Sequence, residues 1–235
     1  MSLDGWQGTV VGILGGLGPA ATVTFLDELV RLTDAHRDQD HVDAVVLQHG
    51  SVPDRTEAII GTGPSPGPVL ARDAQRLAAF GVDLIALPCN SAHAFIDEIE
   101  ADLEVDVLSI VDITAERAAR APARTVAVFA TEGTVAAGTY ARALEARGVT
   151  PWLPPSPMQA QITAIIYDQV KAGEPADVAL LTSLVDEALD AGADVVLFGC
   201  TELSVVYAAE PVLQARPEIV DSLRTLAVAT IERSG

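Results

Sequence analysis

The chain contains very little cysteine. Only two of its 235 residues, Cys89 and Cys200, carry a thiol, and no Cys-x-x-Cys or His-x-x-x-His spacing accompanies them. These counts and spacings do not match a zinc site, so we expect no metal centre. In a cytosolic protein the two cysteines are expected to remain thiols, because cellular reductants oppose disulfide formation. The two thiols therefore need another interpretation.

Positive charge is also scarce. The chain has 14 Lys and Arg against 33 Asp and Glu, a formal net charge of −19, and Lys171 is its only lysine. It has no basic stripe to neutralise phosphates, which excludes nucleic acid as a partner. Charge of this size acts on solubility and association, and it is compatible with a salt-rich cytosol or a GC-rich genome. A site for an anionic ligand must supply its own local cations.

Long apolar runs are absent as well. No stretch approaches the length of a membrane span, and the N-terminus lacks a basic region followed by an apolar segment and a cleavage site. We therefore expect a cytoplasmic protein with no membrane partner. Hydrophobic residues make up 49% of the chain and aromatic residues 4%, which suits an α/β core rich in Ala, Val and Leu.

The two cysteines lie in segments that match each other. Gly81-Val-Asp-Leu-Ile-Ala-Leu-Pro-Cys89 and Gly192-Ala-Asp-Val-Val-Leu-Phe-Gly-Cys200 both place a Gly eight residues and an Asp six residues before the thiol. In each segment the apolar run between the Asp and the cysteine predicts a buried parallel strand that ends at the cysteine. In open α/β sheets, ligands bind at this end of the strands.

Two further pairs of segments extend the match. The apolar runs that begin at Val11 and Val126 both lead into a Gly-containing loop, and Ile110-Val-Asp112 resembles Ile219-Val-Asp221. The pairs follow the same order at nearly constant offset, which indicates an internal duplication.

We predict an α/β protein of two similar domains, each a mostly parallel sheet flanked by helices and related by internal duplication. The first domain is placed at 1–106 plus 214–235 and the second at 107–213. Residues 61–68 are rich in Gly and Pro and predict a mobile surface loop. The patterns predict strands over 9–14, 44–48, 125–130, 149–153 and 194–199, and helices over 19–33, 69–80, 91–99, 134–147, 158–172 and 176–191.

Each cysteine precedes a predicted helix, where the helix dipole and unpaired backbone amides favour a thiolate. The alternative for a single cysteine is an inert, buried side chain that packs like a small hydrophobe. Because the two positions correspond, we favour a functional role for both. One thiol from each of two related halves suggests an acid/base group on either side of a ligand, which is the geometry that a racemase needs.

Other candidate groups are ambiguous. The loop Gly15-Gly-Leu-Gly18 fits no nucleotide-binding motif, and its amides either hold a small anion or only allow a tight turn. Arg55 and Lys171 are candidate cations for a carboxylate, although each could equally be a solvated surface charge. His93 lies one helical turn beyond Cys89, and we interpret it as a helix-face residue rather than a base.

Six motifs in one order cover almost the whole chain. They are Gly12-Ile-Leu-Gly-Gly-Leu-Gly-Pro-Ala-Ala-Thr22, Arg37-Asp-Gln-Asp-His41, Pro53-Asp-Arg-Thr56, Pro88-Cys-Asn-Ser-Ala-His93, Val170-Lys-Ala-Gly173 and Gly199-Cys-Thr-Glu202. Together they resemble the aspartate racemase branch of the aspartate/glutamate racemase superfamily. The resemblance implies a cofactor-independent racemase with its site between the two domains, an amino acid as substrate, and a homodimer.

The resemblance also implies roles for individual residues. Cys89 and Cys200 would be the two acid/base groups, and Arg55 and Lys171 would bind the carboxylates of the substrate. The other substrate-binding residues that it implies are Asp54, Asn90, Ser91, Thr131, Thr134, Tyr167 and Thr201.

The chain departs from the family pattern at three positions. Ser91 stands where Thr is usual, Leu17 where Met is common, and Glu132 where Thr is frequent. A carboxylate at Glu132 would either repel an anionic substrate, bind its ammonium group or point into solvent. The expected substrate is aspartate, and a broad-specificity amino-acid racemase and a maleate-isomerase-like enzyme remain alternatives within the superfamily.

Two other classes of protein fit the sequence less well. A pyridoxal phosphate racemase would need a Schiff-base lysine, for which Lys171 is the only candidate, and no phosphate-binding cup accompanies it. A solute-binding protein of two α/β lobes would be expected to carry an export signal, and it would not need paired thiols.

Overall fold

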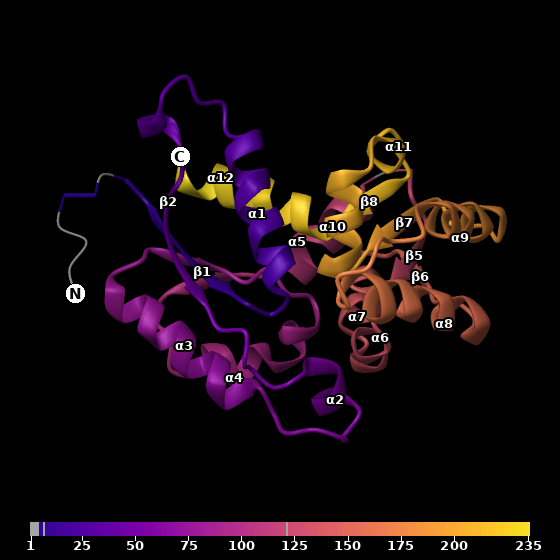
Figure 1. The fold of residues 1–235 in the computed structure, drawn as a ribbon, viewed down its shortest axis with the longest axis horizontal. Helices are drawn as coiled ribbons and strands as arrows, with labels where there is room; N and C mark the ends of the chain where they lie inside the picture. Colours follow the sequence, from indigo (N-terminus) through magenta and orange to yellow (C-terminus); the bar gives the residue numbers. More distant parts are fainter. Residues whose placement is uncertain (1–4, 7, 121) are drawn as a thin grey trace.

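The structure is a computed structural model that describes residues 5, 6, 8–120 and 122–235. It contains two four-stranded parallel sheets with the equivalent strand orders β2-β1-β3-β4 and β6-β5-β7-β8. Helices flank both sheets (Figure 1), which confirms the predicted fold class. The strands are β1 (Val10–Gly15), β2 (Asp43–Gln48), β3 (Leu84–Ala86), β4 (Asp106–Leu108), β5 (Thr125–Phe129), β6 (Thr150–Trp152), β7 (Val195–Phe198) and β8 (Ile219–Asp221).

The helices differ widely in length, and short 3₁₀ turns span Asp38–Asp40 and Ser91–Phe95. A π-helical segment spans Ile165–Val170. The α-helices are α1 (Pro19–Leu32), α2 (Arg55–Ile59), α3 (Gly67–Phe80), α4 (Ile96–Glu100), α5 (Ile110–Ala118), α6 (Glu132–Ala137), α7 (Thr139–Glu145), α8 (Ser156–Ala164), α9 (Val178–Asp190), α10 (Thr201–Ala209), α11 (Pro211–Gln214) and α12 (Ser222–Ser234).

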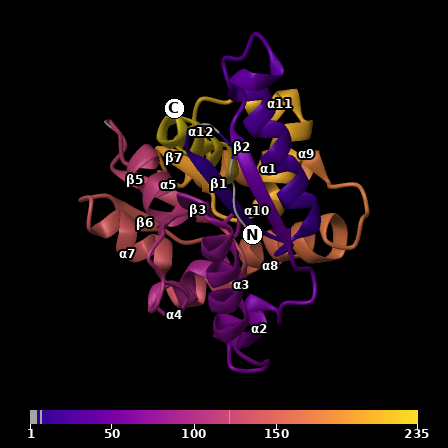
Figure 2. The ribbon, with the colours of Figure 1, turned by 90° about the vertical axis from the view of Figure 1, so that its left-hand side faces the viewer.

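The central strands are apolar throughout because both of their faces are covered. Every residue of β1 is buried, as expected for a parallel strand between two layers of helices. Alternate side chains enter different cores: Val11 and Ile13 pack with Phe25 of α1, whereas Leu14 packs with Leu70 of α3. In Figure 2, α1 and α12 accordingly lie on one side of β1 and β3, and α3 and α4 lie on the other.

The last helix connects the two halves of the molecule. After β8 of the second sheet, α12 packs against α1 and α5, and α5 in turn packs against α7. Figure 1 shows α12 running from the second sheet back behind α1 to the C-terminus. The shared core contains Val11 of β1 together with Val126 of β5 and Leu226 of α12. The two sheets are therefore joined by a continuous apolar core.

The strand pairing differs from the predicted domain boundaries at two places. β4 pairs with β3, so Val107 and Leu108 belong to the first sheet, and β8 pairs with β7, so it belongs to the second. The match of 110–112 with 219–221 is also wrong. Ile110 begins α5, whereas Ile219 begins β8, because short apolar runs fit a helix start and a strand equally well.

Three predicted helices also differ. Residues 91–99 divide into the 3₁₀ turn Ser91–Phe95 and the start of α4. Residues 134–147 divide into α6 and α7 at Gly138, whose φ of 64° is readily adopted only by glycine. The helix predicted over 158–172 passes from α8 into the π-helical segment, which ends just before Lys171. No helix among the described residues is both long and apolar enough to cross a membrane.

Candidate active site

Both thiols lie beyond the carboxyl ends of equivalent strands. Cys89 follows β3 and Cys200 follows β7, and each of these strands is third along the chain within its own sheet. Both cysteines are free and buried, with 3% and 5% of their surface exposed. They line one narrow pocket between the domains. Its lining residues are Leu17, Arg55, Cys89, Asn90, Ser91, Thr131, Thr134, Lys171, Gly199, Cys200, Thr201 and Glu202.

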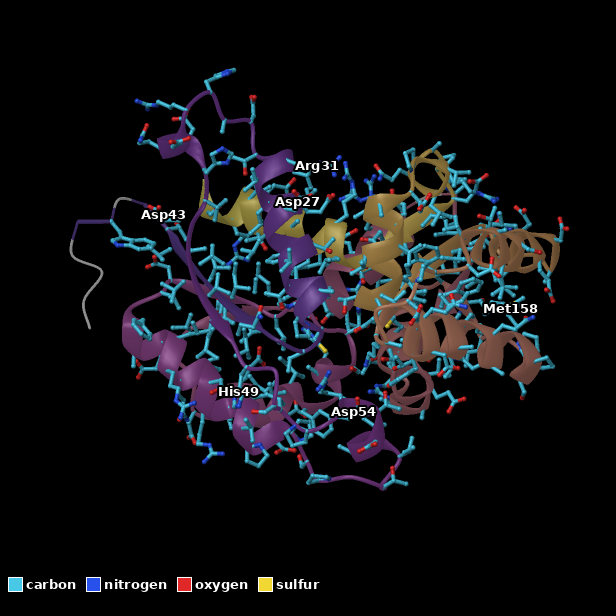
Figure 3. All side chains as sticks on the ribbon, viewed as in Figure 1. Asp27, Arg31, Asp43, His49, Asp54 and Met158 are labelled. Atoms are coloured by element: carbon cyan, nitrogen blue, oxygen red, sulfur yellow. The ribbon has the colours of Figure 1, made fainter. Side chains whose placement is uncertain are left out.

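The pocket brings together nearly all the residues singled out from the sequence. Asp54 and Tyr167 do not line it, but both contact Lys171, which does. Figure 3 shows Asp54 on the side of the first domain that faces the second. The segments that supply the pocket are far apart in sequence, and most are loops or first helical turns at strand ends. Parallel strands place such positions at one edge of each sheet.

Cys200 is held as a thiol by its surroundings. Its Sγ donates a hydrogen bond to Glu202 Oε2 at a distance of 3.0 Å. Burial raises the pKa of Cys200 well above its usual range, and the charge of Glu202 and this hydrogen bond raise it further. Lys171 opposes the shift, but its Nζ is 4.0 Å from the other oxygen of Glu202. At neutral pH the second thiol is therefore protonated and has a carboxylate next to it as a proton acceptor.

Lys171 is the cationic centre of the second-domain wall. Its Nζ lies 3.9 Å from Asp54 Oδ2 and 4.3 Å from the centre of the Tyr167 ring. Burial disfavours its charged form, but Glu202, Tyr167 and Asp54 outweigh this effect and raise the pKa of Lys171. The ammonium group thus remains charged beside the pocket, with 25% of the side-chain surface of Lys171 exposed.

Arg55 supplies the cation from the first domain. It is the first residue of α2, whose N-terminus is capped by the Asp54 side chain through the amide of Glu57. The guanidinium is buried and donates to the carbonyls of Leu17, Val52 and Pro53, while its Nε has no partner. A buried donor without an acceptor is costly, so this N–H is available for a ligand carboxylate.

Hydroxyl groups join the two domains beside the pocket. Tyr167 Oη donates to Thr56 Oγ1 at 2.9 Å, and Thr56 Oγ1 in turn donates to Thr131 Oγ1 at 3.4 Å. Thr131 also caps α6 by accepting from the amide of Thr134. Ser91 Oγ lies 3.6 Å from Cys89 Sγ. The first thiol therefore has a hydroxyl group beside it, whereas Cys200 has the carboxylate of Glu202.

The structure adds groups that the sequence analysis did not select. Glu202 is 6% exposed and, among the described residues, is the only one that brings a carboxylate to the pocket lining. Its position two residues after Cys200 in the quoted Gly-Cys-Thr-Glu motif was the available signal. Gly18 makes room for it, since a Cβ at Gly18 would lie 2.7 Å from Glu202 Oε1. Tyr140 and Ser222 hold the Asn90 side chain by hydrogen bonds, and neither has a local motif.

Three ambiguous positions take defined places. His93 is buried and its ring bonds the carbonyl of Cys89 and the amide of Ile110, so it supports the backbone rather than the thiol. Burial lowers the pKa of His93. Glu132 is exposed in the first turn of α6 and does not line the pocket. The amide of Gly16 is taken by Thr22 Oγ1, which favours a turn-forming role for the Gly-rich loop.

The pocket holds groups that can carry protons together with groups that can bind an anion. It offers one thiol from each domain, a guanidinium with a free N–H, and an ammonium group. Within the described residues, no group of three or more His, Cys, Asp or Glu is placed to hold a metal ion. A small molecule with at least one carboxylate matches these groups.

Comparison with known proteins identifies the family and the fold. The family model described as Asp/Glu/Hydantoin racemase matches residues 14–230. An aspartate racemase of Picrophilus torridus superimposes with a TM-score of 0.83 at 30% identity, covering 97% of this chain and 95% of that one. An aspartate racemase homologue from Pyrococcus horikoshii OT3 shares the fold, with a TM-score of 0.77, 22% identity and coverage of 96% and 99%. A broad-specificity amino-acid racemase of Bacillus subtilis (strain 168) is 27% identical over 226 residues, 94% of this chain and 96% of that protein.

Proposed function

We propose that this chain, which belongs to the Asp/Glu/hydantoin racemase family and is an amino-acid racemase, interconverts the two enantiomers of the acidic amino acid aspartate. In this proposal Cys89 and Cys200 are the two acid/base groups. The observation that carries the proposal is the pair of buried thiols, which lie at equivalent strand ends and line one pocket. A two-base racemase needs one proton carrier for each face of the α-carbon.

The proposed reaction moves one proton on each face. One thiolate removes the α-proton, and the opposite thiol delivers a proton to the other face, so the configuration at the α-carbon is inverted. In the direction in which Cys200 is the acid, it starts from its favoured protonated form and Cys89 is the base. In the reverse direction Cys200 must first lose its proton, and the carboxylate that it already contacts, Glu202, is the nearest acceptor.

The cations serve the charge that develops during this step. Removal of the α-proton places negative charge on the α-carbon and its carboxylate, and fixed donors stabilise that charge without reorganisation. The free Nε–H of Arg55 and the ammonium group of Lys171 are the cationic donors at the pocket. We propose that these two groups bind the two carboxylates of aspartate.

Incubation in heavy water tests the proposal directly. The protein should exchange the α-proton of L-aspartate for deuterium and produce D-aspartate, as followed by NMR and chiral chromatography. The same panel should include glutamate, alanine and lysine, because the Bacillus subtilis relative has broad specificity. Comparable turnover of all four amino acids would replace aspartate with that second candidate function. No exchange with any of them would contradict a racemase of these amino acids.

Removing the charge of Glu202 should change the pH dependence of kcat/KM. Glu202→Gln is expected to lower the pKa of Cys200, because burial, the Glu202 charge and the hydrogen bond to it all raise that pKa. Since the base form is the thiolate, kcat/KM for the enantiomer that Cys200 deprotonates should rise with pH through the alkaline range. In the variant this rise should occur at lower pH.

The measurement is the pH profile of kcat/KM for each enantiomer, together with the ultraviolet absorbance of the Cys200 thiolate in a Cys89→Ala background. Glu132→Gln is the matched control, since it removes an equal charge from an exposed position outside the pocket. An unchanged Cys200 titration in Glu202→Gln would contradict this account.

The expected homodimer and the expected cytoplasmic location of the protein remain predictions.

A further inference from the structure

A second set of reactive side chains lies outside the thiol pocket. His49 follows β2, Ser51 is two residues further along the same turn, and Asp73 lies on α3. His49 Nδ1 is 2.6 Å from Asp73 Oδ2, and His49 Nε2 is 3.1 Å from Ser51 Oγ. Figure 3 shows His49 beside α3 and separate from Asp54. The three side chains are thus joined in the order hydroxyl, imidazole, carboxylate.

The burial of the three groups follows the same order. Asp73 is fully buried, the His49 side chain is 32% exposed, and Ser51 is exposed. A buried carboxylate accepts the Nδ1 proton and thereby leaves Nε2 as an acceptor for the hydroxyl. The reactive oxygen is therefore in contact with solvent, and the group that orients the base is not. The other oxygen of Asp73 accepts from Arg76 at 2.6 Å, which further fixes the carboxylate.

Free backbone donors lie beside the hydroxyl. The amides of Gly50, Ser51 and Val52 donate to no backbone or side-chain acceptor within the described part of the chain. Unpaired amides in a turn bind an anion where their N–H groups point to the same side. Such donors stabilise the oxyanion of a tetrahedral intermediate when they lie next to the attacking oxygen.

We propose that Ser51, His49 and Asp73 form an acyl-transfer site for small, activated carboxylic esters, separate from the thiol pocket. Ser51 Oγ attacks the ester carbonyl carbon while His49 Nε2 takes the hydroxyl proton. The C–O bond of the ester then breaks, and the protonated His49 gives its proton to the departing oxygen. Water attacks the acyl-serine with His49 as the base, releasing the carboxylic acid and restoring Ser51. Exposure of Ser51 on a turn suits substrates that need no enclosing cavity.

The test is hydrolysis of p-nitrophenyl acetate by the full chain, followed by release of p-nitrophenolate. Because buried thiols could also be acylated, the assay uses a Cys89→Ala/Cys200→Ala background. In that background Ser51→Ala and His49→Gln should each lower the rate above buffer by about 10²-fold, the usual contribution of a positioned base and its nucleophile. Ser65→Ala is the matched control, since Ser65 is exposed in the loop before α3 and lies outside both sites.

Covalent labelling provides the second readout. A fluorophosphonate should modify one serine of the same background protein, and peptide mass spectrometry should locate the label at Ser51. The label should be lost in Ser51→Ala and His49→Gln but kept in Ser65→Ala. The proposal is overturned if Ser51→Ala hydrolyses the ester as fast as Ser65→Ala, or if the label falls on another residue. Because Ser51 is exposed, its replacement should leave the thermal unfolding midpoint unchanged, which the same samples can show.

Discussion

Replacing either thiol by alanine is expected to lower kcat/KM for racemisation by about 10³-fold, because a positioned acid/base group contributes roughly 10²- to 10⁴-fold and each face of the α-carbon needs its own. Cys89→Ala and Cys200→Ala should both show this loss with L- and D-aspartate. Each variant should still exchange the α-proton of one enantiomer with solvent deuterium, since a single base suffices for that half-reaction. The two variants should retain opposite enantiomers.

The retained exchange is also the internal control, because a misfolded variant would lose both activities. Chiral chromatography measures racemisation, and proton NMR in heavy water measures exchange on the same sample. If either alanine variant racemised aspartate at a rate near that of the unaltered protein, the two-base proposal would be wrong. If both variants exchanged the same enantiomer, the assignment of one thiol to each face would be wrong.

Arg55→Lys is expected to lower kcat/KM for aspartate by about 10²-fold, which corresponds to about 2.7 kcal/mol, the loss of one or two charge-assisted hydrogen bonds. The substitution keeps the positive charge but removes the planar fork. In the structure that fork donates to three carbonyls of the surrounding loops and leaves Nε free. An ammonium group cannot make the same set of contacts and also present a directed N–H to a carboxylate.

Arg72→Lys is the matched control, because Arg72 is exposed on α3 and lies outside the pocket. Its kcat/KM should stay unchanged, whereas Arg55→Lys should raise KM and lower kcat. Comparing aspartate with alanine tests whether two carboxylates are recognised. Equal turnover of the two amino acids, unaffected by Lys171→Met, would rule out recognition of a carboxylate pair.

The positions of the thiols could be predicted because they depend on a short-range pattern. An apolar run after Gly-x-Asp predicts a buried parallel strand, and such strands end at one edge of their sheet. Cys89 and Cys200 could therefore be assigned to equivalent edges before any contact was known. The elements near glycine were harder to predict: α6 and α7 are separated at Gly138, since an apolar periodicity does not show where the backbone takes a positive φ.

The partners of the site residues could not be predicted in the same way. Glu202 stands two residues after Cys200 in the sequence, but its effect on the thiol depends on burial and on Lys171, which directly follows the π-helical segment. The bond between Asn90 and Ser222 joins residues 132 positions apart. His49 and Asp73 come from a strand end and a helix with no shared motif. Contacts of this kind arise only when elements pack, so local pattern carries no record of them.

The amino-acid sequence by itself determined the class of fold, the equivalence of the two sheets and the placement of one thiol at the ligand-binding edge of each, because strand formation and burial follow from local hydrophobic pattern. The tertiary structure decided which groups meet at the pocket and in what protonation state. It brings the thiols of separate sheets to one pocket, buries Cys200 against Glu202 and leaves the Nε of Arg55 without a partner. The physical reason is that burial and charge–charge distance set pKa values and hydrogen bonding, and both are properties of the packed chain rather than of any segment.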